Sequence, residues 1–358
     1  MVVSIHYFHD SGGQLPPVWH RLLSFFGLGW TGVDLFFVLS GFLIGGILLD
    51  ARTSPSYFKT FYLRRFFRII PIYYLWIVLY LLLAWAAGGI LQSKMQLDAG
   101  PVKSWGIWAH FLFLQNLWIH SYAPLASWWF GVSWSLAIEE QFYLVVPFVI
   151  WSLSKRRLII FLVFVVSAAL LCRILLRAFV PASASAAYIL MPCRADALAL
   201  GVLGAISWRD AGFREWLSRN GKLLYGAFGA LLAGMGVLGI WFSSHDGLFT
   251  QTVGYTWIAL FYLSLLYVAM ADSGGWIARL ARMGWLREWG RVSYCVYLIH
   301  PAVRYFCFRY LKLDPTQLTG WRGVAGGLLA VAVTYGIARM SWTFFEQPLL
   351  LRGHRYRY

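Results

Sequence analysis

The sequence predicts an all-α integral membrane protein of about ten transmembrane helices. Of its 358 residues, 60% are hydrophobic and only 12% are charged, whereas a soluble domain carries about 25% charged residues. Apolar runs close to the roughly 20 residues needed to cross a bilayer recur along the whole chain. The 20 Trp and 20 Tyr residues suit aromatic belts at the two membrane surfaces. We expect a single membrane domain over residues 1–358, without a soluble domain.

Hydrophobic patterning predicts where the helices lie. Residues 1–8 resemble the end of a first helix, but eight residues are too few to span a bilayer, so we expect this first helix to be truncated at its N-terminus. The segment 105–119 is apolar but short. Nine full-length spans are expected at roughly 30–49, 69–91, 133–153, 158–178, 187–207, 223–243, 251–271, 291–311 and 323–345.

The positive charges decide the topology. If 105–119 does not cross, the loops on one side hold 19 Lys and Arg residues and those on the other side hold 5. If it does cross, every later basic cluster lies on the opposite side of the membrane. Because Lys and Arg accumulate on the cytoplasmic side of a membrane, we expect 105–119 not to cross. The protein is then a multi-pass membrane protein with both termini in the cytoplasm.

Several other classes of function are disfavoured. The net charge of +16 lies in short clusters between apolar runs, so it indicates orientation in a lipid bilayer and no nucleic-acid partner. The four cysteines are far apart in apolar segments, without the spacing of a metal site or a disulfide framework. The GxGxxG pattern of Gly234–Gly239 falls in a membrane span without a preceding strand, which favours close helix packing over dinucleotide binding.

Ionisable residues inside the spans indicate a polar interior, because charge in a bilayer is costly and is usually functional. Two stripes at helical spacing stand out, Ser135–Glu139–Tyr143 and Ser293–Tyr297–His300–Arg304. Such an interior fits an enzyme or a transporter. The full set of intramembrane candidates is Asp34, Glu139, Glu140, Arg194, Asp196, His300 and Arg304, with Arg173 and Arg177 near a helix end.

Six motifs in order along the chain together resemble acyltransferase family 3, the membrane O-acyltransferases of bacterial surface polysaccharides and related glycans. In this family the first helix carries an Arg and, after ten residues, a His that is thought to be catalytic. Val2–Tyr7 is similar to the stretch ending in that His, which places His6 there and the Arg before Met1. The motifs are Gly32–Phe42, Arg64–Pro71, Trp134–Tyr143 (WSLxxEExFY), Arg194–Gly201 (RxDxLxxG), Ser293–Pro301 and Phe345–Pro348.

The resemblance implies an enzyme of a bacterial inner (plasma) membrane, an acyltransferase that transfers groups other than amino-acyl groups. It would move an acyl group, in the first place acetyl, from acyl-CoA to a hydroxyl of a glycan or a lipid-linked sugar. Acyl-CoA is a donor substrate, and no permanently bound cofactor or metal is expected. His6 would be the general base, since imidazole has the right basicity near neutral pH; His9 is close but does not match the motif. Glu139 would orient His6 or pair with a buried Arg such as Arg194.

Arg64, Arg65 and Arg68 would bind the phosphates of coenzyme A on the cytoplasmic side, because guanidinium groups suit phosphate oxygens. Their structural alternative is an orientation signal in contact with lipid headgroups. His300 precedes Pro301, whose missing N–H could kink the helix and widen the site. Further residues are expected to line or support the cavity: Asp34, Ser40, Trp134, Glu140, Arg194, Tyr297 and His300.

The alternative class of function is a multi-helix transporter or flippase for a polar solute. It would use the same polar cavity without chemistry. The family resemblance and the absence of an obvious repeat between the two halves of the sequence favour the enzyme. The sequence identifies neither the acceptor nor the length of the acyl group.

Overall fold

The computed structural model describes residues 1–8, 27–86, 101–117, 126–180, 184–241, 246–313 and 320–358. Over these residues the chain forms helices and no strand, so it is an all-α integral membrane protein. Seven stretches are long and apolar enough to cross a membrane. They are Gly27–Asp50, Tyr57–Ala86, Lys155–Phe179, Ser185–Arg209, Gly221–Ile240, Thr250–Ala271 and Arg322–His354.

Each of the nine predicted spans contains a long helix. Two of them begin earlier than the apolar runs do, at Tyr57 and at Gly284, because charged residues such as Arg and Glu interrupt an apolar run without interrupting a helix. The long helices are α3 (Gly32–Asp50), α4 (Tyr57–Ala86), α8 (Trp134–Ser152), α9 (Lys155–Phe179), α11 (Met191–Arg209), α13 (Gly221–Trp241), α14 (Tyr255–Ala271), α16 (Gly284–Tyr310) and α17 (Gly320–Ser341).

Shorter elements connect these helices. In the doubtful segment 105–119 the helix is α6, whose 11 residues reach about 16 Å, well short of the roughly 30 Å hydrocarbon core. The short elements are α1 (Val2–Phe8), η1 (Gly27–Thr31), α6 (Pro101–Phe111), η2 (Ala126–Phe130), α10 (Ala184–Ile189), α12 (Ala211–Arg219), η3 (Thr250–Gly254), α15 (Trp276–Ala281), η4 (Trp342–Glu346) and α18 (Gln347–His354).

The chain divides into two compact units, each built from distant parts of the sequence. That the whole chain forms one domain stays a prediction. The first unit comprises Met1–Val2, Ser24–Thr53 and Gln141–Gly290, and the second comprises Val3–Leu23, Ser54–Glu140 and Arg291–Tyr358.

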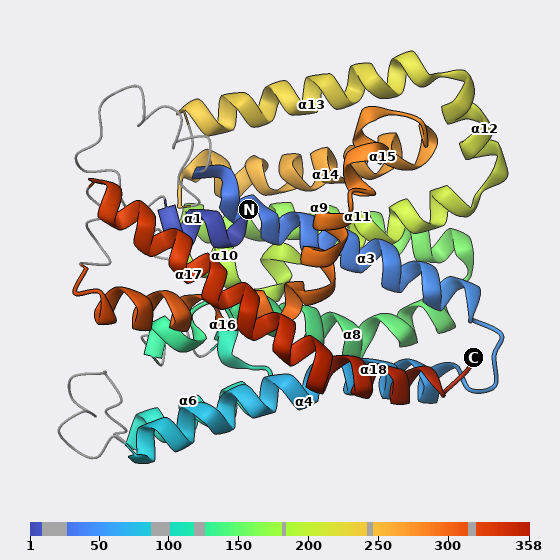
Figure 1. Cartoon of the computed structure of the whole chain (residues 1–358). Helices are drawn as coiled ribbons and strands as arrows, with labels where there is room; N and C mark the ends of the chain where they lie inside the picture. Colours follow the sequence, from blue (N-terminus) through green and yellow to red (C-terminus); the bar gives the residue numbers. More distant parts are fainter. Residues whose placement is uncertain (9–26, 87–100, 118–125, 181–183, 242–245, 314–319) are drawn as a thin grey trace. The chain divides into compact units, whose positions relative to one another are not determined.

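In the first unit, α3 and α11 lie against each other through glycines (Figure 1). A Cβ atom on Gly41 would lie 2.1 Å from the carbonyl oxygen of Leu198, and one on Gly201 would lie 2.3 Å from that of Val38. The two backbones therefore touch, as small residues allow in membrane helices. Gly234 of the GxGxxG pattern packs in the same way against the Trp257 indole of α14.

In the second unit, α18 packs along the first part of α4 (Figure 1). Gly353 makes this approach possible, because a Cβ atom there would lie 3.2 Å from the Cβ atom of Phe67. A separate apolar cluster joins α1, α16 and α17 through the buried side chains of Tyr7, Phe308 and Ala330.

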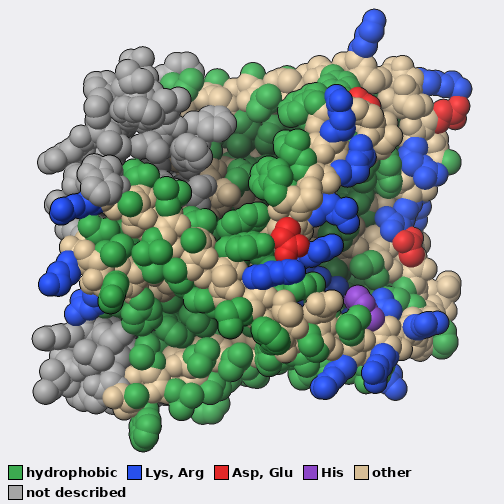
Figure 2. Space-filling model, viewed as in Figure 1, with side chains coloured by type: hydrophobic (Ala, Val, Ile, Leu, Met, Phe, Trp, Pro, Cys, Tyr) green, Lys and Arg blue, Asp and Glu red, His purple; other side chains and the backbone are tan. Residues whose placement is uncertain are grey.

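Large apolar side chains are exposed along the flanks of the helices, where lipid would cover them. Phe164 is 65% exposed, Leu144 64% and Leu328 59%. Figure 2 shows such hydrophobic side chains over much of the visible surface, with Lys and Arg gathered nearer the helix ends. Exposed apolar area on this scale is typical of a protein whose solvent is partly lipid.

Candidate active site

The second unit brings together two histidines that are almost 300 residues apart in sequence. The rings of His6 on α1 and His300 on α16 meet edge to face, with 5.0 Å between their centroids. His6 is half-buried and His300 is fully buried. The predicted base and a residue predicted only to support it are therefore in direct contact. His9 lies outside the described residues.

Pro301 determines how the His300 ring is held. A helical residue at this position would donate its N–H to the carbonyl of Tyr297, but proline has none. The ring Nδ1 of His300 lies 2.7 Å from that carbonyl oxygen and 3.2 Å from the Val296 oxygen. A carbonyl only accepts, so Nδ1 carries the hydrogen in the neutral ring and Nε2 holds the lone pair. That Nε2 atom is buried without a hydrogen-bond partner, and its lone pair can accept a hydrogen bond.

Tyr7, next to His6, anchors α1 to two other helices. Its hydroxyl donates to the backbone carbonyl of His300 at 2.9 Å, so it must accept from the Thr334 hydroxyl, 2.7 Å away on α17. This buried bridge sets the position of the His6 backbone relative to α16. Sequence reasoning missed both residues, because a Tyr and a Thr in apolar helices carry no signal of a partner.

A hydroxyl pair lies one helical turn from His300. The hydroxyls of Ser135 on α8 and Tyr297 on α16 are 2.6 Å apart, and both lie near the Val132 carbonyl. The rings of Tyr297 and His300 have centroids 5.9 Å apart. The two stripes predicted from spacing therefore meet at this pair.

Glu139 is buried and shares the α8 face of Ser135, four residues earlier. Trp134, next to Ser135, is buried as well. Glu140 is half-buried, and its Oε1 atom has no hydrogen-bond partner. The structure thus places Glu139, rather than Glu140, on the face that carries the hydroxyl pair.

The three predicted donor-binding arginines lie in the first turns of α4, within the helix rather than before it. Arg65 is half-buried and Arg68 is exposed. Arg64 donates from Nε at 3.0 Å and from a terminal nitrogen at 2.7 Å to the carbonyl of Tyr356. Its guanidinium also lies 5.0 Å from the ring centre of Tyr358, whose pKa burial raises.

The distance along the helix axes between these arginines and the histidines follows from the rise per residue. The Tyr294 hydroxyl donates to the Ile69 carbonyl at 3.4 Å, so these two residues lie at one level of α16 and α4. At 1.5 Å per residue, Arg64 lies about 8 Å before that level on α4 and His300 about 9 Å beyond it on α16. The two histidines therefore lie roughly 16 Å from Arg64 and roughly 10 Å from Arg68 along the helix axes, and the larger distance is near half the thickness of a bilayer core.

The first unit holds the remaining predicted residues in a buried ionic cluster. Arg194 on α11 donates to Asp34 on α3 at 2.6 Å, and its guanidinium lies 3.9 Å from the ring centre of Tyr255. Ser40 on α3 and Tyr143 on α8 have hydroxyls 2.7 Å apart. Asp34 and Arg194 thus join α3 to α11, as a structural ion pair would.

A second buried ion pair lies in the same unit. Arg173 on α9 donates to Asp196 at 2.9 Å and to the Thr256 hydroxyl at 2.6 Å. Thr256 in turn donates to Asp196 at 2.6 Å. Thr256 lies just after η3, a π-helical turn, and nothing in the sequence marks it as a partner of this pair.

Over the described part of the chain, no group of three His, Cys, Asp or Glu side chains could hold a metal ion. The groups near His6, namely the His300 imidazole and the Ser135–Tyr297 hydroxyl pair, can exchange hydrogen bonds and protons.

The chain also resembles known proteins. The family profile described as an acyltransferase domain matches residues 1–339. The peptidoglycan O-acetyltransferase OatA of Listeria monocytogenes is 29% identical over 343 residues, which cover 91% of this chain and 52% of that protein. The O-acetyltransferase OatA of Staphylococcus aureus is 28% identical over 352 residues, covering 94% of this chain and 55% of that protein. The chain thus spans about half the length of these relatives. No solved structure matches it.

Proposed function

The chain belongs to acyltransferase family 3, and from that membership and the contact between His6 and His300 we propose that it is a membrane O-acyltransferase. It moves an acetyl group from acetyl-CoA to a hydroxyl of a glycan. The single observation that carries the proposal is the half-buried His6 against His300, which has a buried nitrogen able to accept a hydrogen bond from His6.

One histidine, His6, both takes up and returns the proton in the proposed reaction. His6 takes the proton of the acceptor hydroxyl as its oxygen attacks the carbonyl carbon of the thioester. The tetrahedral intermediate then expels the sulfur of coenzyme A, which takes the proton back from His6 and leaves as the thiol. The Tyr297 hydroxyl exchanges its bond to the Val132 carbonyl for a hydrogen bond to the developing oxyanion, and the Ser135 hydroxyl beside it keeps it in place. His300 holds the protonated His6 through its Nε2 lone pair.

The donor and the acceptor approach from opposite faces of the membrane. Arg64, Arg65 and Arg68 hold the phosphates of coenzyme A at the cytoplasmic face, and its flexible arm reaches the roughly 10 to 16 Å from these arginines to the histidines. The asymmetry of Lys and Arg supports this orientation, with both termini in the cytoplasm of a bacterium and the acceptor outside the inner membrane. To reach phosphate, Arg64 must exchange its bond to Tyr356.

The names of the relatives support a glycan acceptor. One is a peptidoglycan O-acetyltransferase and another an O-acetyltransferase. We extend to this chain the shared part of those names, transfer of an acetyl group to oxygen, with a polysaccharide of the cell surface as the acceptor class.

The decisive experiment incubates the purified protein in lipid nanodiscs with radiolabelled acetyl-CoA and peptidoglycan fragments. We expect His6→Ala to lower kcat by about 10²–10⁴-fold, with donor affinity retained, because the base acts on the acceptor proton. His354→Ala is the matched control, since that histidine is exposed at the end of α18. Full activity of His6→Ala would refute the assignment. Transport of a solute by a parent protein that labels no acceptor would favour a transporter.

The donor site has its own test. Replacing Arg64 and Arg68 by Ala should weaken binding of coenzyme A, and the weakening should shrink at high salt because the contacts are between charges. Replacement by Lys should restore binding only in part, since an ammonium lacks the two-pronged geometry of guanidinium. Lys59→Ala, an exposed change on the same helix, is the control. Unchanged donor affinity would leave the arginines as an orientation signal.

A further inference from the structure

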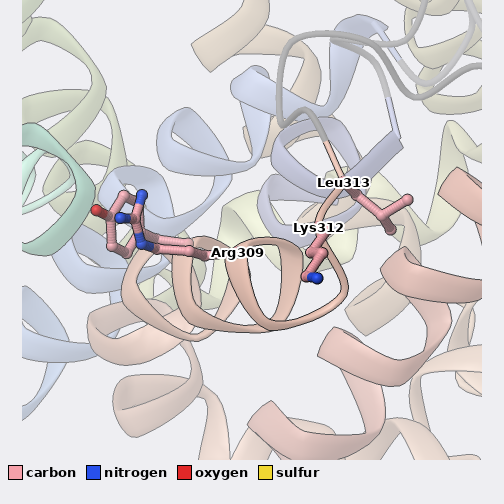
Figure 3. Close-up of a pocket in the computed structure, with 4 residues that line it drawn as sticks. Arg309, Lys312 and Leu313 are labelled. Atoms are coloured by element: carbon pink, nitrogen blue, oxygen red, sulfur yellow. The ribbon is translucent and has the colours of Figure 1, made fainter.

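A cavity of about 410 Å³ lies at the C-terminal end of α16, in the second unit. Its walls are Tyr305, Arg309, Lys312 and Leu313. Figure 3 shows the last three of these side chains where they leave the final turn of α16 and the residues that follow it. Arg309 and Lys312 are both exposed, so the cavity is open and carries two positive charges.

The turn that ends α16 holds Lys312 in place. The Leu313 N–H donates to the Phe308 carbonyl at 2.9 Å, and the Lys312 N–H donates to the Arg309 carbonyl at 3.2 Å. These two bonds form a Schellman cap, in which the residue at the position of Lys312 is left-handed and usually glycine. Lys312 has a φ of 52°, and Leu313 packs against Phe308 as the motif requires. A lysine thus occupies a left-handed position, where glycine has the lower conformational energy.

Neither cation forms an ion pair with a described residue; Asp314, two residues after Lys312, lies outside the described residues. The ion pairs formed by the described residues involve Lys155, Arg173, Arg194, Arg209 and Arg219, and none of them includes Arg309 or Lys312. Cations near a helix C-terminus are favoured by the helix dipole. That effect explains a positive charge there but not the cavity, and the cap already satisfies the last carbonyls of α16.

An aromatic pair adjoins the cations. The Trp128 indole stacks on the Tyr305 ring with 4.5 Å between centroids and 24° between planes. Trp128 also meets Phe306 edge to face at 5.6 Å. Flat rings with an apolar face and a polar edge suit a partner that is itself part apolar and part polar, as a sugar ring is.

The position of the cavity relates it to the reaction. Arg309 lies nine residues beyond His300 on the same helix, about 14 Å along its axis. It lies at the end of α16 away from Arg64, because Tyr294 on α16 is already level with Ile69 on α4. Arg64 and Arg309 are therefore separated along the helix axes by roughly 30 Å, the thickness of a bilayer core.

We propose that this cavity binds an anionic group of the acceptor glycan, a carboxylate or a phosphate, and thereby holds the glycan with a hydroxyl toward His6. This inference rests on the proposed function and narrows it, since the substrate class becomes an anionic glycan. Arg309 and Lys312 bind the anionic oxygens, and the sugar next to them lies on the Tyr305 side of the cavity. The aromatic pair makes the site specific for a glycan rather than for a free anion.

The test compares two acceptors, a peptidoglycan tetrasaccharide that carries carboxylates and the same fragment with its carboxylates methyl-esterified. With the parent protein in phosphatidylcholine nanodiscs, the KM of the ester should be about tenfold higher. Arg309→Gln should raise the KM of the charged fragment by about tenfold and leave that of the ester unchanged. Lys312→Gly should act in the same direction while keeping the left-handed turn. Arg322→Gln, an exposed change at the start of α17, is the matched control.

A binding measurement separates this proposal from the proposed function. If the parent protein transfers no acyl group, the proposed function fails. The cavity is then judged by the affinities of the two fragments for the parent and for Arg309→Gln. Preference for the charged fragment that is lost in Arg309→Gln supports the site. Equal affinities of the two fragments would overturn the proposal. A preference that appears only when phosphatidylglycerol is absent would also overturn it, because the cavity would then be a site for a lipid headgroup.

Discussion

The ring Nδ1 of His300 takes the place of a backbone N–H at the Tyr297 carbonyl, 2.7 Å away. Pro301 leaves this carbonyl without a backbone donor, because a proline in a helix donates no hydrogen bond to the residue four positions earlier. Pro301 thus determines the tautomer of the residue before it and leaves Nε2 of His300 as an acceptor beside His6. Both carbonyl contacts of the ring lie on α16 itself, so the arrangement does not depend on any neighbouring helix.

We expect Pro301→Ala to lower activity while raising stability. Alanine returns an N–H to the Tyr297 carbonyl, which then competes with the His300 ring for the same acceptor. A proline inside a helix costs about 3 kcal/mol relative to alanine, whereas the lost ring hydrogen bond is worth about 1 kcal/mol. The measurements are kcat and the melting temperature in nanodiscs. Pro147→Ala in α8 is the control, with the gain in stability alone. Undiminished kcat in Pro301→Ala would show that the tautomer is irrelevant.

His300→Asn and His300→Gln should separate the two nitrogens of the ring. The Asn amide can replace Nδ1 as donor to the Tyr297 carbonyl, whereas the Gln amide places its polar atoms nearer to Nε2. If Nε2 assists His6, Gln should retain more kcat than Asn, by about tenfold for one hydrogen bond of roughly 1.4 kcal/mol. Acetyl transfer at saturating acceptor measures this. The opposite order would mean that His300 serves only to hold α16.

Breaking the Asp34–Arg194 pair should be costly, and replacing both residues much less so. Asp34→Asn leaves the buried Arg194 without its charged partner, which destabilises by about 3–5 kcal/mol. In the double variant Asp34→Leu, Arg194→Met neither charge remains, and we expect less destabilisation than from Asp34→Asn. Chemical unfolding followed by Trp fluorescence gives these values. Lys155→Ala removes the exposed pair with Asp210 and should change stability by no more than about 1 kcal/mol.

Gly41→Ala should destabilise the first unit strongly. Its new Cβ atom would lie 2.1 Å from the backbone oxygen of Leu198, so α3 and α11 must separate, at a cost of about 1–3 kcal/mol or more. Gly226→Ala in α13 is the matched control, because nothing lies within 4 Å of its Cβ position. There alanine should stabilise by about 0.5–1 kcal/mol. Similar melting temperatures for the two variants would contradict the close approach of α3 and α11.

Hydrophobic periodicity in the sequence by itself determined the helices. Apolar runs longer than a bilayer crossing have no other low-energy form in lipid, where each backbone group must be bonded within its own segment. The sequence also pointed to His6, Tyr297, Ser135 and His300, through a family resemblance and through spacings that put polar groups on one face. It placed the starts of α4 and α16 too late, since charge ends an apolar run but does not end a helix.

Only the tertiary structure decided which polar groups meet. Helical spacing states which residues share a face, but it does not say which other helix that face contacts. The contacts of Tyr7 with His300 and Thr334, and of Arg173 with Thr256, join residues far apart in the chain whose types carry no pairing signal. The cavity beside Arg309 likewise depends on how α16 ends and on the Trp128 segment next to it. A single buried hydrogen bond is a property of two packed surfaces, and the sequence specifies it only through the whole fold.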